Sequence, residues 1–231
     1  MTRNLSTALC LTAFLCCSTL VFGADDGFQS IFDGKSLDGW DGNTSFWSVK
    51  EGAITGQTTK ENPTKGNTFL IWKKGPVKDF ELRLKFKIDG GNSGIQYRSK
   101  DHGNHVVGGY QADFDDAGGY TGILYEERGS RGIMGARGKK TVWSSDGEQT
   151  EAAGEATDKD ILDSYKKKDW NEYTVIAKGN HLIHKVNGKV TVDVTDEDPK
   201  KSVAEGILAL QLHAGPPMTV QFKDIQLKEL K

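Results

Sequence analysis

Residues 91–132 contain three consecutive runs in which polar and apolar side chains alternate: GNSGIQYRS, GGYQADFDD and TGILYEERGSRG. Successive side chains of a β-strand point to opposite faces of its sheet, so each run predicts a strand with one apolar and one polar face. In the second run, Gln111, Asp113 and Asp115 share the polar face. This pattern restricts the segment to a sheet that covers a hydrophobic core on one side and presents a binding surface on the other.

Alternation also assigns faces to the charged groups of the first and third runs. Arg98 follows Gln96 by two positions, so their side chains are predicted to share a face. The third run ends in a charged group that includes Glu126 and Arg131. Glu127 points away from Glu126 if the strand continues, so only one of the two carboxylates is expected to face the binding surface.

The rest of the chain predicts further short strands and almost no helix. The clearest strand is 80–88, where five apolar residues alternate with four charged ones. The pair Asn187-Gly188 favours a tight hairpin turn. Two more strands are predicted at 205–213 and 219–230, and the first of them ends at His213. Short strands joined by glycine-rich turns predict an all-β fold of two packed antiparallel sheets.

The segment 136–169 is long, polar and charged, and its main apolar residues are Trp143 and Tyr165. Thr157 or Asp158 is a suitable N-cap for a short helix. A segment of this length inside a compact domain is usually either functional or disordered. We expect a partly ordered flap that lies over the polar sheet face, and a plain surface insertion is the alternative.

The N-terminus predicts a secretory signal peptide. Arg3 is the only charged residue before Asp25, and an apolar run covers 5–22. A cleavage after the glycine at the end of 1–23 fits the small-residue rule, and no stop-transfer charges follow. We therefore expect residues 24–231 to form a single exported domain without a membrane span, in the periplasm or outside the cell. A retained membrane anchor is less favoured because the apolar run is short.

All three cysteines, Cys10, Cys16 and Cys17, lie inside the predicted signal peptide. The remaining chain therefore offers no disulfide, no thiolate zinc site and no thiol nucleophile. Loss of Arg3 changes the net charge from −2 to −3. This weak negative charge gives no reason to expect nucleic acid or a membrane as a partner.

Several motifs resemble a known family. In chain order they are FDGKSLDGW, DFELRLKFKI followed by GNSGIQYRS, GYQADF with TGILYEERGSRG, DWNEYTV with VNGK, and GILALQLHAGPPMTVQFKDIQLKEL. Together they resemble the bacterial 3-keto-disaccharide hydrolase family over nearly all of the predicted mature chain. The resemblance implies a concanavalin A-like jelly roll, export, and action on oxidised sugars. The segment 135–168 departs from the family pattern, which leaves the substrate open.

The chemistry that the resemblance implies follows from the ketone of such a sugar. A ketone at C3 acidifies the hydrogen on C2, so a base can expel the group on C1 by elimination, and water then adds to the enone. The reaction needs a base, a cation or metal at the enolate oxygen, and an acid near the leaving oxygen. An upstream sugar oxidoreductase would have to supply the ketone.

His213 is the first candidate for the base because it ends a predicted strand and shares a face with Gln211. Its alternative role is a hydrogen bond to a turn carbonyl. Glu126 is the rival base or the acid, and its alternative is a surface carboxylate paired with Arg128. Arg131 completes the predicted catalytic group, as a cation for the enolate or the sugar hydroxyls.

Substrate binding is assigned to side chains that hydrogen-bond or stack. Arg98 is expected to contact sugar hydroxyls, although it and Arg131 could instead form structural ion pairs with Asp113 or Glu126. The remaining predicted binding residues are Gln111, Asp113 and Gln211, which would hydrogen-bond hydroxyls, and Trp143, which would stack on a sugar from the flap.

A divalent metal is a possible cofactor. His213 with Glu126 or Asp113 could hold one, but a single histidine without a spaced partner is a weak signal, so no metal ligand is assigned.

Two other functions fit the same polar face. One is a lectin-like module that binds a glycan without cleaving it. The other is a retaining glucanase, which needs carboxylates at alternate positions of one strand. The pattern of Gln111, Asp113 and Asp115 has this spacing, but a glutamine stands where the nucleophile belongs.

Overall fold

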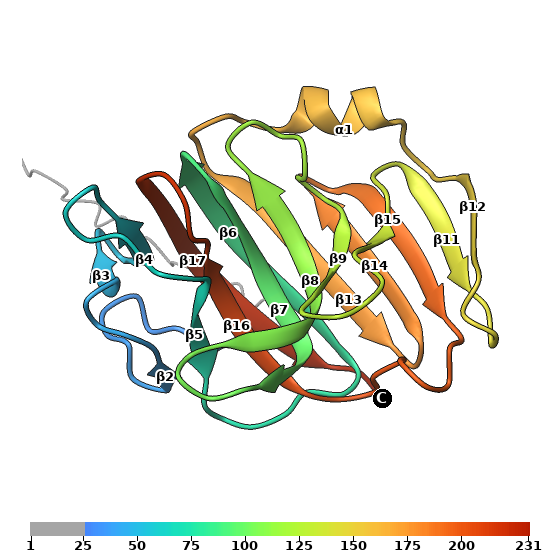
Figure 1. Cartoon of the computed structure of the whole chain (residues 1–231), viewed down its shortest axis with the longest axis horizontal. Coiled ribbons are helices and arrows are strands. Elements are labelled where there is room, and N and C mark those ends of the chain that lie inside the picture. Colours follow the sequence, from blue (N-terminus) through green and yellow to red (C-terminus); the bar gives the residue numbers. More distant parts are fainter. Residues whose placement is uncertain (1–25) are drawn as a thin grey trace, which may run out of the picture.

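The computed structural model describes residues 26–231, which fold into two stacked β-sheets and one short helix (Figure 1). We call the ten-stranded sheet the large sheet; its path runs β12-β11-β15-β14-β13-β6-β17-β4-β3, and β1 pairs with β17. Its strands are β1 (Gln29–Ser30), β3 (Trp47–Lys50), β4 (Ala53–Thr58), β6 (Phe80–Asp89), β11 (Lys139–Trp143), β12 (Gln149–Ala153), β13 (Asn171–Lys178), β14 (His181–Val186), β15 (Lys189–Asp196) and β17 (Met218–Glu229).

We call the seven-stranded sheet the small sheet; its order is β10-β9-β8-β7-β16-β5-β2. Its strands are β2 (Trp40–Asp41), β5 (Thr68–Trp72), β7 (Asn92–Asp101), β8 (Val107–Asp115), β9 (Leu124–Glu127), β10 (Ile133–Gly135) and β16 (Ile207–Leu212). All of its pairings are antiparallel. The three runs of 91–132 thus supply β7, β8 and β9, side by side and in chain order.

The hydrophobic core lies between the two sheets. The apolar side of β6 is buried there, and Phe86 of that strand packs on Phe114 of β8 with ring centroids 4.0 Å apart. Burial of such aromatic side chains supplies much of the packing energy of a core. The prediction of an all-β, two-sheet fold is confirmed. One pairing departs from it, because β11 pairs with β15 in parallel.

The segment 136–169 is not a flap over the polar face of the small sheet, so that prediction is wrong. It supplies β11 and β12 to one end of the large sheet, and then the helix α1 (Asp158–Ser164) (Figure 1). Trp143 is buried in the core, and its indole nitrogen donates a hydrogen bond to the Met134 carbonyl at 2.9 Å. The expected N-cap is correct: Thr157 and Asp160 form a capping box.

The predicted signal peptide, 1–23, lies outside the described residues. Within 26–231, no helix is long and apolar enough to cross a membrane.

Candidate functional site

The outer face of the small sheet carries a pocket of about 440 Å³, which we call the small-sheet pocket. Its volume falls in the range of roughly 300–1,000 Å³ that is usual for small-molecule sites. Its lining comes from segments that are distant in the sequence but meet on this face. The lining residues are Asn67, Asn92, Gln111, Asp113, Tyr120, Tyr125, Glu127 and His213.

Strand alternation explains which side chains reach the small-sheet pocket. On β8, Gln111 and Asp113 face outward, while the residues between and beside them are core. On β9, Tyr125 and Glu127 face outward, and Leu124 belongs to the core. The predicted faces of Gln111 and Asp113 are therefore correct.

Asp113 is the most perturbed acidic group of the small-sheet pocket. It is 5% exposed, and burial raises its pKa to about 8, although hydrogen bonds from Asn92 and Gln111 oppose this shift. The Gln111 amide nitrogen lies 3.2 Å from its Oδ1 atom. A carboxyl group with this pKa keeps its proton at neutral pH, so it can donate it to a ligand oxygen.

Gln111, which lines the pocket, forms a buried layer with two further glutamines. Gln96 and Gln211 both donate hydrogen bonds to the Gln111 side-chain carbonyl, at 2.6 and 3.0 Å. A Cβ atom on Gly94 would lie 2.5 Å from the Gln111 Cγ atom, so only glycine leaves room for this arrangement. Gln211 is fully buried and does not line the pocket, so we assign it to support of Gln111 instead of the predicted contact with substrate.

Glu127 is a lining carboxylate that the sequence analysis did not choose. Its Oε1 atom accepts a hydrogen bond from the Asn67 amide at 3.3 Å, and its Oε2 atom lies 3.4 Å from the Gln211 amide. The register of β9 on β8 could have identified Glu127 as the outward residue. Glu126 pairs with Tyr110, a core residue, so the outward position on this strand belongs to Glu127.

His213, the first candidate for the base, lies in the small-sheet pocket just after β16. Its Nδ1 atom lies 2.5 Å from the Ala214 carbonyl. A carbonyl oxygen can only accept, so Nδ1 must carry the hydrogen in this bond. In this tautomer the Nε2 atom carries a lone pair instead of a hydrogen. The bond to a turn carbonyl, weighed as an alternative role, thus fixes the tautomer that a base needs.

Glu126 and Arg131 do not join His213, so the predicted catalytic group does not form. Arg131 donates to Glu126 Oε1 from Nε at 2.9 Å and from Nη2 at 2.7 Å, and Nη1 binds Asp196 Oδ2 at 2.9 Å. Burial raises the pKa of Glu126, but the hydrogen bonds from Arg131 outweigh it, and the pKa is lowered overall. These side chains form the structural ion pair that the sequence left open.

Arg98 and Trp143 also lie away from the small-sheet pocket. Arg98 has a φ of +45°, and the pairing of β7 with β8 shifts register beside it, so the alternation fails at this residue. Its guanidinium instead binds Asp79 at 2.9 Å and the Lys78 carbonyl at 2.7 Å. Trp143 is a core residue of the large sheet and cannot stack on a sugar in the pocket.

Within 26–231, no three histidine, cysteine or acidic side chains lie close enough together to hold a metal ion. Glu126, one of the ligands considered from the sequence, is engaged by Arg131.

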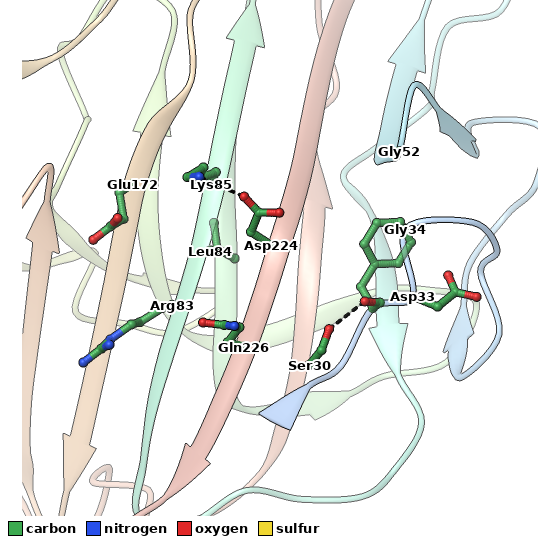
Figure 2. Close-up of a pocket in the computed structure, with 11 residues that line it drawn as sticks. Ser30, Asp33, Gly34, Gly52, Arg83, Leu84, Lys85, Glu172, Asp224 and Gln226 are labelled. Atoms are coloured by element: carbon green, nitrogen blue, oxygen red, sulfur yellow. Dashed lines mark hydrogen bonds and ion pairs between the residues drawn. The ribbon is translucent and has the colours of Figure 1, made fainter. Parts of the chain in front are cut away.

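A second depression, of about 570 Å³, lies on the outer face of the large sheet (Figure 2). Its charged side chains are paired with one another or exposed, as Lys85 is with Asp224 at 2.9 Å. None of its lining residues among 26–231 is a histidine. The small-sheet pocket is therefore the candidate site.

Comparison with known sequences gives one family. The model of the 3-keto-alpha-glucoside-1,2-lyase-like domain matches residues 27–228. A 3-keto-disaccharide hydrolase from Bacteroides thetaiotaomicron is 34% identical over 86 residues, which cover 33% of this chain and 29% of that protein. The match thus spans less than a third of that relative.

Solved structures share the fold at low sequence identity. A candidate glycosyl hydrolase from Parabacteroides distasonis superposes with a TM-score of 0.57 at 20% identity, over 88% of this chain and 99% of that one. Carbohydrate-binding module CBM66 from Bacillus subtilis gives 0.54 at 14% identity, over 83% and 96%. SCLam, a non-specific endo-β-1,3(4)-glucanase, gives 0.55 at 11% identity, over 89% and 92%. These similarities confirm the jelly-roll sandwich.

Proposed function

The chain belongs to the family of 3-keto-alpha-glucoside-1,2-lyase-like domains, and from that membership we propose that it cleaves the glycosidic bond of 3-keto-glycosides in the small-sheet pocket. The observation that carries this proposal is that His213, whose Nδ1 atom is bound to the Ala214 carbonyl, and Asp113, whose pKa burial raises to about 8, line one pocket. A base and an acid with access to the same ligand are what the elimination requires.

The reaction proceeds in two steps. In the first, the base removes the hydrogen on C2, the electron pair forms the C1–C2 double bond, and the C1–O bond breaks as the leaving oxygen takes a proton. In the second, a water oxygen adds to C1 and a proton returns to C2. The ketone at C3 makes the first step possible because it delocalises the charge on C2. No covalent bond to the protein forms.

His213 removes the C2 hydrogen with Nε2, while the bond from Nδ1 to the Ala214 carbonyl holds the ring in the required tautomer. Asp113 delivers a proton to the leaving oxygen, since its raised pKa keeps the carboxyl group neutral. Glu127, held by Asn67, orients the water that adds to C1. The amides of Gln111 and Asn92 hydrogen-bond the sugar hydroxyls and the enolate oxygen.

The glucanase mechanism is less well supported. It needs a second carboxylate beside Asp113, and the nearest candidate on the strand is Asp115. The carboxylate of Asp115 instead accepts the backbone N–H groups of Gly119 and Tyr120, at 3.1 and 2.7 Å. Asp115 is therefore committed to the loop that follows β8.

The test of the proposed function compares two substrates with the purified protein. A 3-keto-glucoside should be consumed and the ordinary glucoside should not. His213→Ala should lower the rate by at least about a hundredfold, the range that is usual for loss of a general base. His102→Ala, a change of an exposed loop histidine, serves as the matched control and should keep the full rate.

Three results would overturn parts of this proposal. Binding of the 3-keto-glucoside without turnover would identify a carbohydrate-binding module instead of an enzyme. Full activity of His213→Ala would remove the base. Loss of activity on addition of a chelator would show a metal requirement that the side chains of 26–231 do not explain.

Two further parts of the proposal concern the setting of the reaction. The segment 1–23 acts as a signal peptide, so the mature protein works outside the cytoplasm. N-terminal sequencing of the secreted or periplasmic protein should begin at Ala24. The ketone at C3 of the substrate comes from a sugar oxidoreductase that acts before this protein.

A further inference from the structure

Tyr120 is the most exposed large apolar side chain within 26–231. It is 53% exposed, whereas the other exposed large apolar side chains, Ile133, Leu162 and Val203, are 36–44% exposed. It also lines the small-sheet pocket. An aromatic ring that stays in water beside a sugar pocket offers a flat apolar surface to a ligand.

Hydrogen bonds fix the loop that carries Tyr120. The Asp115 Oδ1 atom accepts the Tyr120 N–H at 2.7 Å, and Oδ2 accepts the Gly119 N–H at 3.1 Å. The hydroxyl of Tyr165, which follows α1, donates to the Asp115 carbonyl at 3.1 Å. The ring is therefore presented from an ordered backbone, which lowers the entropy that a ligand must remove on binding.

Arg137 fastens the same loop from the segment 136–169. Its Nη1 atom donates to the carbonyls of Gly118 and Thr121, both at 2.8 Å, and its Nε atom binds Asp158 Oδ1 at 2.7 Å. Asp158 is the first residue of α1. Figure 1 shows this helix at the same end of the molecule as the β8–β9 loop. The segment 136–169 thus supports one wall of the pocket.

The order of groups in the pocket places Tyr120 at its rim. Tyr120, Tyr125, Glu127 and Asp113 line the same pocket. Asp113 is buried and Tyr120 is half exposed. A glycoside with its reacting carbons at Asp113 and His213 would extend its leaving group toward Tyr120.

We propose that Tyr120 is the platform on which the leaving group of the glycoside stacks, and that it selects substrates whose leaving group is itself a ring, such as a second sugar. This inference rests on the proposed function. Arg137 is a positioning residue, because it acts through the loop and does not touch the ligand.

The experiment measures kcat and KM for two 3-keto-glucosides that differ only in the leaving group, a second pyranose or methanol. Tyr120→Ala should raise KM for the disaccharide roughly three- to tenfold, the effect of one lost aromatic contact, and leave KM for the methyl glycoside unchanged. Tyr120→Phe should behave as wild type. Val203→Ala, a change of another exposed apolar residue, is the matched control and should alter neither substrate.

Arg137→Ala should raise KM for the disaccharide alone, by no more than Tyr120→Ala does, and the double variant should match Tyr120→Ala. Arg137→Lys should restore binding only in part, because all three donors of a lysine sit on one nitrogen, whereas Arg137 binds the carbonyls from Nη1 and the carboxylate from Nε. An equal increase in KM for both substrates, or no increase for either, would overturn the role of Tyr120.

The two proposals fail in different ways. If the wild type cleaves neither glycoside, the proposed function is wrong, and the Tyr120 inference is then decided by calorimetric titration with the 3-keto-disaccharide. Weaker binding by Tyr120→Ala than by Val203→Ala would still support the platform. Equal affinities would refute it.

Discussion

Arg131 and Glu126 form an ion pair at 2.7 Å between the two sheets, where their side chains are 2% and 10% exposed. Arg131 also pairs with Asp196 at 2.9 Å. This cluster fixes the turn after β9. Glu127, the last residue of β9, faces the small-sheet pocket. Two adjacent carboxylates therefore have separate tasks, one structural and one at the candidate site.

Glu126→Gln should lower stability and spare catalysis. The change leaves Arg131 with one carboxylate fewer in a buried site, which should cost on the order of 2 kcal/mol of unfolding free energy. Urea unfolding gives that value, and kcat of the folded variant should stay within about twofold of wild type. A large loss of kcat at unchanged stability would return Glu126 to the catalytic group.

Glu127→Gln should show the opposite profile. Its two carboxylate oxygens accept long hydrogen bonds from the Asn67 and Gln211 amides, and a glutamine in its place can keep one of them, so stability should change by less than about 1 kcal/mol. The rate should fall at least about tenfold, because the water that adds to C1 loses its acceptor. Wild-type kinetics in this variant would remove Glu127 from the mechanism.

Asp113→Asn should stabilise the protein increasingly as pH rises. The folded pKa of about 8 exceeds the unfolded value of 3.8, so between these values the folded state binds more protons than the unfolded one. The unfolding free energy of the wild type therefore falls as pH rises from about 4 to 8, and an asparagine does not titrate. The variant should gain on the order of a few kcal/mol at pH 9 and nothing at pH 4.

The same group should set the alkaline limit of activity. Asp113 loses its proton as pH rises through about 8, so the rate of the wild type should fall there. The rate of Asp113→Asn should be low at every pH and should not fall near pH 8. Urea unfolding at pH 4, 7 and 9 and a pH–rate profile check both effects; a wild-type rate that is flat from pH 7 to 10 would contradict the role of Asp113.

Much of the fold and half of the site could be predicted, because strand alternation is a local property. The faces of Gln111 and Asp113 follow from their neighbours alone. Arg98 was misplaced because a left-handed residue and a register shift reverse the alternation there, and the sequence around it gives no glycine signal for this.

The other errors come from contacts between distant segments. Choosing between Glu126 and Glu127 requires the register of β9 on β8, which pairs Glu126 with Tyr110. The flap was wrong because Trp143 and its strand join the large sheet by parallel pairing with β15, a contact that spans some fifty residues. Neither pairing can be read from a local pattern.

Gly94→Ala should disturb the pocket from below. A methyl group there would lie 2.5 Å from the Gln111 Cγ atom and 2.6 Å from Cδ. Overpacking of this kind typically costs about 1–3 kcal/mol, and the displaced amide should raise KM for the 3-keto-glucoside. Gly66→Ala is the matched control, since nothing lies within 4 Å of its added carbon. Equal stability and KM in the two variants would show that the glutamine layer is not needed.

The fate of the C2 hydrogen tests the central claim most directly. In D2O, wild-type cleavage of a 3-keto-disaccharide should yield 3-keto-glucose with deuterium at C2, measured by NMR at early times and corrected for exchange without protein. His213→Ala should form product at least about a hundredfold more slowly. Product that keeps its hydrogen at C2, or an undiminished rate in His213→Ala, would contradict an elimination driven by His213 in the small-sheet pocket.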